Sequence, residues 1–211
     1  YGFKLFNGRS ELHLLNLTKH VQSVSLAERE ARNKHKSAVL WFSGLSASGK
    51  STLAMATQSE LFNRGCQVNV LDGDNVRHGL NAGLGFSEAD RVENLRRVAE
   101  TARLFAESGM IVLASFISPL AKNRAQARQI IEPLNFFDIY VKVGLDTAEA
   151  RDPKGLYSKA RSGEIKDFTG INAPFEAPEN PDLIIENDTQ SIEAGVEQII
   201  TFMKQKQIIL D

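Results

Sequence analysis

The sequence predicts an α/β fold in which a mostly parallel, five-stranded sheet is doubly wound, with helices on both faces. Five short apolar runs read as buried strands, and helical patterns lie between them. Strands that alternate with helices form parallel sheets, because right-handed crossovers return each helix to the sheet. The length of 211 residues and the 42% hydrophobic content suit one domain with a substantial core.

The predicted strands are rich in β-branched and aromatic residues. They span Ala38–Ser43, Val68–Asp72, Ile111–Phe116, Phe137–Val143 and Leu183–Glu186. The predicted helices span Lys50–Asn63, Glu88–Ser108, Ala121–Ile131 and Ile192–Lys204. In such sheets ligands bind at the carboxyl ends of the strands, so we expect the site there.

Residues 151–180 are polar, charged and rich in glycine and proline, without a strong apolar period. Long segments of this kind are typical of lids and binding loops. We predict a mobile lid with a short helix near Leu156–Arg161. A long surface loop without a role in binding is the alternative.

The chain divides into residues 1–15, which are a native extension or residues added by cloning, an N-terminal segment 16–36, and a main domain 37–211. Cys66 is the only cysteine, which excludes a disulfide framework, and no apolar run approaches the length of a membrane span. A net charge of -1 argues against a nucleic-acid partner. We expect a cytoplasmic protein with neither a nucleic-acid nor a membrane partner.

Residues 44–51 read GLSASGKS, the phosphate-binding pattern G-x-x-x-x-G-K-S, placed between a predicted strand and a predicted helix. The loop amides and the helix N-terminus attract phosphate. Lys50 is expected to reach the β- and γ-phosphates, and Ser51 to ligate Mg²⁺. The N/T-K-x-D element of GTPases is missing, so ATP is favoured. The ATP-binding residues expected in this loop are Gly44, Leu45, Ser46, Ala47, Ser48, Gly49, Lys50, Ser51 and Thr52.

Asp72 and Asp74 follow the second predicted strand. One carboxylate beside a phosphate loop can hold Mg²⁺ through water, and another can accept the proton of an attacking hydroxyl. We assign Mg²⁺ to Asp72 with Ser51 and the proton to Asp74, while the reverse assignment of the two acids stays open. The alternative is that both acids only cap a helix or form a turn.

Ser87 reads as the N-cap of the helix that begins at Glu88, with Asp90 at capping-box spacing. Arg91 and Asn94 share one face of this helix, and an arginine fork suits phosphate or sulfate. Spacing alone favours a solvated, charged helix face.

Seven motifs occur in order: GLSASGKST (44–52), LDGDNVR (71–77), LGFSEADR (84–91), SFISP (115–119), DPKGLY (152–157), FTGI (168–171) and EAPE (176–179). Together they resemble the adenylylsulfate kinase family of P-loop kinases, from about Asn16 to the C-terminus. Ser158 stands where many members carry lysine, and Ala47 replaces a commoner glycine.

The resemblance implies transfer of the γ-phosphate of ATP to the 3′-hydroxyl of adenylylsulfate, which gives 3′-phosphoadenylylsulfate. It implies that Arg77, Arg91 and Asn94 grip the acceptor, that Phe86 and Phe168 sandwich its adenine, and that Ile117, Ser118 and Pro119 line its pocket. In some members the residue at Ser118 is described as a phosphoserine. Direct transfer needs no such intermediate, and Ser118 could instead cap the following helix.

In the lid, Lys154 and Lys159 are expected to neutralise phosphate charge, Arg151 to pack on the ATP base, and Leu156 to contact the acceptor. The resemblance also implies a homodimer and leaves open a link to ATP sulfurylase. The alternatives are another small-metabolite or nucleotide P-loop kinase, and a catalytically silent nucleotide-sensing domain. The silent domain should have lost Lys50 or Asp72, which are present.

Overall fold

A computed structural model describes residues 20 and 22–210. The predicted extension 1–15 and the first residues of the segment 16–36 lie outside the described residues. The sheet has five strands in the order β2-β3-β1-β4-β5, and every pairing is parallel. The strands are β1 (Ala38–Ser43), β2 (Val68–Asp72), β3 (Ile111–Ser115), β4 (Phe136–Lys142) and β5 (Leu183–Glu186).

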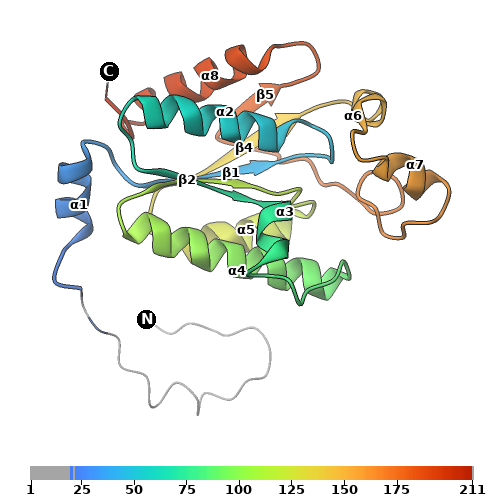
Figure 1. Ribbon diagram of the computed structural model, residues 1–211, viewed down its shortest axis with the longest axis horizontal. Coiled ribbons are helices and arrows are strands. Elements are labelled where there is room, and N and C mark those ends of the chain that lie inside the picture. The colour runs from blue at the N-terminus through green and yellow to red at the C-terminus, as the bar shows by residue number, and fades with distance from the viewer. Residues whose placement is uncertain (1–19, 21, 211) are drawn as a thin grey trace.

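The helices cover both faces of this sheet, as the doubly wound prediction requires (Figure 1). They are α1 (Leu26–Asn33), α2 (Lys50–Asn63), α3 (Gly73–His78), α4 (Glu88–Glu107), α5 (Ala121–Ile131), α6 (Leu145–Arg151), α7 (Leu156–Arg161) and α8 (Ile192–Gln205). Helices α2 and α8 lie on one face, and α4 and α5 on the other (Figure 1). None of the helices in the described part of the chain is both long and apolar enough to cross a bilayer.

The central strand β1 is buried along its whole length and divides the core in two. Its side chains alternate between the faces, as strand geometry dictates. Leu40 and Phe42 pack toward α2 and α8, whereas Val39 and Trp41 pack toward α4 and α5. A fully buried side chain of this kind contributes roughly 1.5–3 kcal/mol, so β1 anchors both layers.

Three short helices are additions to the prediction. Helix α1 begins with a complete capping box, in which Ser25 and Glu28 satisfy each other's backbone amides. Helix α3 is capped by Asp72, and α6 ends at Arg151, where the predicted lid begins. The S-x-x-E spacing of residues 25–28 is the signal that would have identified α1.

Residues 151–180 contain the predicted short helix, α7. A third apolar cluster joins this segment to the phosphate loop through Leu45, Tyr157 and Phe168. The hydroxyl of Tyr157 donates to the carbonyl oxygen of Ser46 at 3.0 Å. That residues 151–180 move as a lid stays a prediction.

Candidate active site

The phosphate loop runs from the end of β1 into the N-terminus of α2. Gly44 and Gly49 have φ angles of 148° and 90°. A Cβ on Gly44 would lie 2.5 Å from the carbonyl oxygen of Val141, so only glycine fits there. Ala47 has a φ of 57°, a left-handed conformation that costs an alanine roughly 1–2 kcal/mol. The alanine therefore keeps the loop conformation at an energetic cost.

Lys50 is buried in this loop, and its ammonium contacts only neutral acceptors. Nζ donates to the carbonyl oxygen of Leu45 at 2.6 Å and to Oγ of Ser48 at 3.2 Å. Burial lowers the pKa of Lys50 to about 7, and the charge of Asp72 opposes this shift only in part. A phosphate group would supply the missing anion.

Ser51, Asp72 and Ser115 gather oxygen atoms beside Lys50. Ser51 Oγ donates to Asp72 Oδ2 at 2.6 Å and lies 3.2 Å from Ser115 Oγ. Asp72 Oδ1 accepts from the amide of Asp74 at 3.0 Å, so Asp72 also caps α3. Hydroxyl and carboxylate oxygens are the donors that Mg²⁺ takes, and the residues present fit this ion. Ser115 opens the SFISP motif but is not among the predicted site residues.

Asp74 is exposed and forms an ion pair with Lys154 of the predicted lid. Both line a cavity of about 830 Å³ at the carboxyl ends of the strands. Lys50, Ser51, Thr52 and Arg151 line the same cavity. The structure therefore brings together the phosphate loop, both acids and two predicted lid residues.

Asn187, which sequence reasoning missed, ties the predicted lid to the phosphate loop. Its Nδ2 donates to the carbonyl oxygen of Ser48 at 2.7 Å, and its own carbonyl accepts from Arg151 at 2.7 Å. Asn187 is buried at the end of β5. Its only sequence signal is a polar residue directly after a predicted strand.

Arg77 and Arg91 both lie close to the Phe86 ring. Their guanidinium carbons are 4.3 Å and 6.0 Å from the ring centroid. Arg91 also donates to the carbonyl of Asp167 at 2.8 Å, which connects α4 to the predicted lid. Burial lowers the pKa of both guanidinium groups, and for Arg91 the charge of Arg77 adds to this. Arg91 is therefore partly buried and bonded to the predicted lid, and an anion beside the two arginines would be stabilised.

Asn94 lies one turn beyond Arg91 on α4 and is buried. Its Oδ1 accepts from Nδ2 of Asn81 at 3.0 Å, so its own amide nitrogen points away from Asn81. Asn81 is fully buried and precedes a glycine-rich turn. Sequence reasoning missed Asn81 because no local pattern shows that it contacts α4.

Phe86 and Phe168 occupy opposite environments. Phe86 is 66% exposed, whereas Phe168 is 8% exposed and packs edge-on against Tyr157, with ring centroids 5.0 Å apart. Core packing therefore describes Phe168 in this structure. The sandwich of an adenine between the two rings stays a prediction.

Ser118 lies in the loop between β3 and α5 and has a left-handed φ of 45°. Its Oγ accepts from Nε1 of Trp41 at 2.9 Å, inside the protein. The alternative that Ser118 caps α5 is wrong, because the N-cap is Leu120 and no side chain of the first turn caps the helix. Glu176 performs that role, since its Oε2 accepts from the amide of Ala121 at 2.6 Å.

The remaining predicted residues lie near this loop or in the lid segment. The carbonyl of Ile117 accepts from the amide of Gly44 at 3.3 Å, which joins the SFISP loop to the phosphate loop. Lys159 pairs with Glu164 at 3.7 Å, and Leu156 packs against the third apolar cluster. Lys159 thus pairs within the predicted lid and does not line the cavity that Asp74 and Lys154 share.

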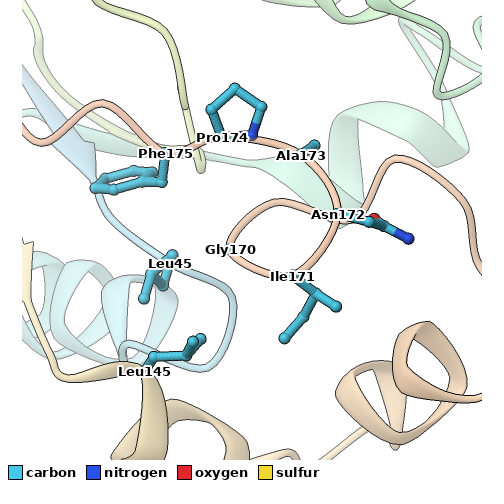
Figure 2. A pocket seen from close by; sticks show the side chains of 8 residues that line it. All are labelled: Leu45, Leu145, Gly170, Ile171, Asn172, Ala173, Pro174 and Phe175. Atoms are coloured by element: carbon cyan, nitrogen blue, oxygen red, sulfur yellow. The ribbon is translucent and has the colours of Figure 1, made fainter.

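A second pocket, of about 580 Å³, opens between Leu45, Leu145 and residues 170–175. Figure 2 shows Leu45, Leu145 and Phe175 around the open space, with the polar side chain of Asn172 directed away from it. Its lining is mainly apolar and none of its side chains is charged, so it lacks the cationic side chains that line the 830 Å³ cavity.

Comparison with known proteins identifies the relatives of the chain. A family profile described as adenylylsulphate kinase matches residues 36–186. An adenylyl-sulfate kinase of Geotalea daltonii is 50% identical over 195 residues, covering 92% of this chain and 96% of its own. One of Staphylococcus epidermidis is 50% identical over 194 residues, covering 92% and 98%.

Solved structures give the same result. An APS kinase of Mycobacterium tuberculosis, in complex with AMPPNP and APS, is 47% identical with a TM-score of 0.78, covering 81% of this chain and 99% of its own. A hexameric APS kinase from Thiobacillus denitrificans is 29% identical with a TM-score of 0.65, covering 87% of this chain and 32% of that longer chain.

Proposed function

Because this chain belongs to the adenylylsulphate kinase family, we propose that its phosphate loop and its arginine pair are the two halves of one transfer site. The enzyme transfers the γ-phosphate of ATP to the 3′-hydroxyl of adenylylsulfate (APS), which gives ADP and 3′-phosphoadenylylsulfate in sulfate assimilation. The position of Asp74 is the observation that supports joining the phosphate loop and the arginine pair into one site. It lines the phosphate-loop cavity, and three residues further along the chain Arg77 contacts the ring of Phe86.

ATP occupies the 830 Å³ cavity, with its phosphates on the loop amides and its base near Arg151. Lys50 moves from the carbonyl of Leu45 to the β- and γ-phosphates. Ser51 and Asp72 hold Mg²⁺, which neutralises charge on the phosphates when bound. The Ser51–Asp72 contact of 2.6 Å keeps these oxygens on the side of the loop where the γ-phosphate would lie.

APS binds with its charged groups between Arg77 and Arg91 and with its adenine on the exposed face of Phe86. Its 3′-oxygen attacks the γ-phosphorus, the bond from that phosphorus to the β–γ bridging oxygen breaks, and the hydroxyl proton passes to Asp74. Asp74 must first leave Lys154, which turns to the γ-phosphate. Since Ser118 directs its hydroxyl toward Trp41, the transfer proceeds without a phosphoserine.

Three further parts of the proposal rest on the family and on general chemistry. Residues 151–180 close over both nucleotides and exclude water, which suppresses ATP hydrolysis. The enzyme works as a homodimer in the cytoplasm, where ATP is supplied. Light scattering of the purified protein tests the subunit number, and a monomeric mass would contradict the dimer.

The test of the reaction is ADP release from ATP and Mg²⁺, measured with and without APS. We expect release that depends on APS, together with a product phosphorylated at the 3′-position. Equal release without APS would overturn the assignment.

Exchanging each acid for asparagine distinguishes the role of Asp74 from that of Asp72. Asp74→Asn is expected to lower kcat by roughly 10²–10⁴-fold at an unchanged Mg²⁺ requirement, because it removes the proton acceptor. Asp72→Asn is expected to raise the Mg²⁺ concentration needed for half-maximal activity. Near-normal turnover of Asp74→Asn would reverse the assignment of the two acids.

A further inference from the structure

A buried charged pair lies directly beneath the SFISP loop and lines no part of the nucleotide cavity. Arg124 of α5 is 6% exposed, and its Nη1 donates to the carbonyl oxygen of Ser118 at 2.8 Å. Its Nε lies 3.8 Å from Oδ2 of Asp138 on β4. Asp138 accepts from Ser43 at the end of β1, at 3.2 Å. Of the two contacts of the guanidinium, the one with the carbonyl oxygen of Ser118 is therefore the shorter.

Burying this pair is costly. Burial lowers the pKa of Arg124 and raises that of Asp138, which shows that both charged forms lose solvation. Ion pairs of this kind are often no more stabilising than well-packed apolar side chains of the same volume. Stability of the fold alone is thus a weak explanation for an arginine at this position.

The loop above Arg124 has a strained backbone that needs support. The left-handed φ of Ser118 costs a residue with a side chain roughly 1–2 kcal/mol. Each carbonyl oxygen of residues 117–119 accepts a hydrogen bond from a different part of the chain. Gly44 donates to Ile117, Arg124 to Ser118, and Glu176 to Pro119. Two of these donors are backbone amides, and Arg124 is the side chain among the three.

We propose that Arg124 is a positioning residue for phosphoryl transfer, which acts through the carbonyl of Ser118 to hold the acceptor-binding loop in register with the phosphate loop. This inference rests on the proposed function, in which residues 117–119 line the APS site. Arg124 touches neither nucleotide. Loosening the loop displaces the acceptor hydroxyl, and a displacement of about 1 Å can cost about 100-fold in rate.

The test compares Arg124→Met with Arg124→Lys and with Arg128→Met as a matched control. Arg128 lies one turn further on α5 and also bonds a backbone carbonyl and an acid, Phe136 at 3.4 Å and Asp182 at 2.8 Å. Arg124→Met is expected to raise the KM for APS by about ten- to a hundredfold and to lower kcat, with the KM for ATP within about twofold of wild type. Arg124→Lys should recover part of the loss, and Arg128→Met should behave as wild type.

Tryptophan fluorescence gives a second readout, because Trp41 is the only tryptophan in the chain and donates to Ser118. APS should change the emission of the wild type and of Arg128→Met. In Arg124→Met, the APS concentration that gives half of this emission change should rise by the same factor as the KM for APS.

The outcomes separate the inference from the function on which it rests. A wild type without APS-dependent ADP release overturns the proposed function. An active wild type, with Arg124→Met at wild-type kinetic constants, overturns the positioning role alone. Equal changes in both KM values, or only a smaller active fraction, also overturn it, because they indicate a general loss of structure. If Arg124→Met does not fold, Arg124→Lys is judged by the same criteria.

Discussion

At the scale of single residues, the burial of Lys50 makes the stability of the fold depend on pH. Its pKa is about 7 in the folded protein, against 10.5 for an ordinary lysine. Between these values the unfolded chain binds a proton that the folded protein does not, so this group makes folding more favourable as the pH rises from 7 to 10.5. Below pH 7 the folded protein bears the full cost of burying the charge.

We therefore predict that ATP binding takes up about one proton at pH 8, because the phosphates favour the charged form of Lys50. Calorimetry in two buffers with different ionisation enthalpies measures the uptake. Lys50→Met should bind ATP weakly without the uptake, lose activity, and unfold at a higher temperature than wild type at pH 6. Identical binding enthalpies in both buffers would contradict the shifted pKa.

Asn81 illustrates a residue that acts through its neighbour. Because Asn81 holds the Oδ1 of Asn94, Asn81→Ala should leave the amide of Asn94 free to turn and should raise the KM for APS more than the KM for ATP. Loss of one buried hydrogen bond costs about 1–3 kcal/mol, so we expect an effect of about tenfold. Steady-state kinetics with each substrate varied in turn measures it, and a larger effect on ATP would contradict the role.

At the scale of elements, the first turn of α4 carries Arg91, one of the side chains proposed to bind the acceptor. Ser87 caps this helix, since its Oγ accepts from the amide of Asp90 at 3.2 Å. Ser191 caps α8 in the same way, by accepting from Ala194 at 3.2 Å. The two serines therefore allow a comparison between a cap next to the proposed acceptor site and a cap at the border of the proposed ATP cavity.

We predict that Ser87→Ala and Ser191→Ala each lower the free energy of unfolding by about 1 kcal/mol, measured by urea denaturation. Only Ser87→Ala should also raise the KM for APS, because a frayed first turn moves Arg91. A matching rise in Ser191→Ala would show that the kinetic effect follows stability and not the position of α4.

At the scale of the whole molecule, packing of α8 on α2 holds the helix that begins at the phosphate loop. Gly195 makes this close approach possible, since a Cβ there would lie 2.9 Å from Cδ1 of the fully buried Leu53. Gly83 lies in a turn where a Cβ would meet no atom within 4 Å.

Gly195→Ala should therefore destabilise the protein by roughly 1–3 kcal/mol through overpacking, even though alanine is the better helix former. Gly83→Ala should leave the midpoint of urea denaturation nearly unchanged. A Gly195→Ala variant as stable as wild type would show that α8 can shift away from α2 without loss.

The main elements could be predicted from the sequence because their signals are local. All five predicted strands are present, with ends that differ by at most one residue, as at Phe116 and Phe136. Predicted helices such as Glu88–Ser108 agree as closely with the structure. The short helices α3 and α6 are too short for an apolar period to develop, so their sequences resemble turns.

The phosphate loop and the family could likewise be derived from the sequence alone, because contiguous motifs carry their chemistry. The tertiary structure alone decided which side chains support the site. Asn187 on Ser48, Trp41 on Ser118 and Glu176 on Ala121 are contacts between segments at least 55 residues apart in the chain. Asn81 on Asn94 and Arg124 on Ser118 are closer in sequence, at 13 and 6 residues, but each joins a loop to a helix whose relative position the fold sets. No local pattern records such contacts, because each depends on how strands and helices pack and not on the spacing of neighbouring residues.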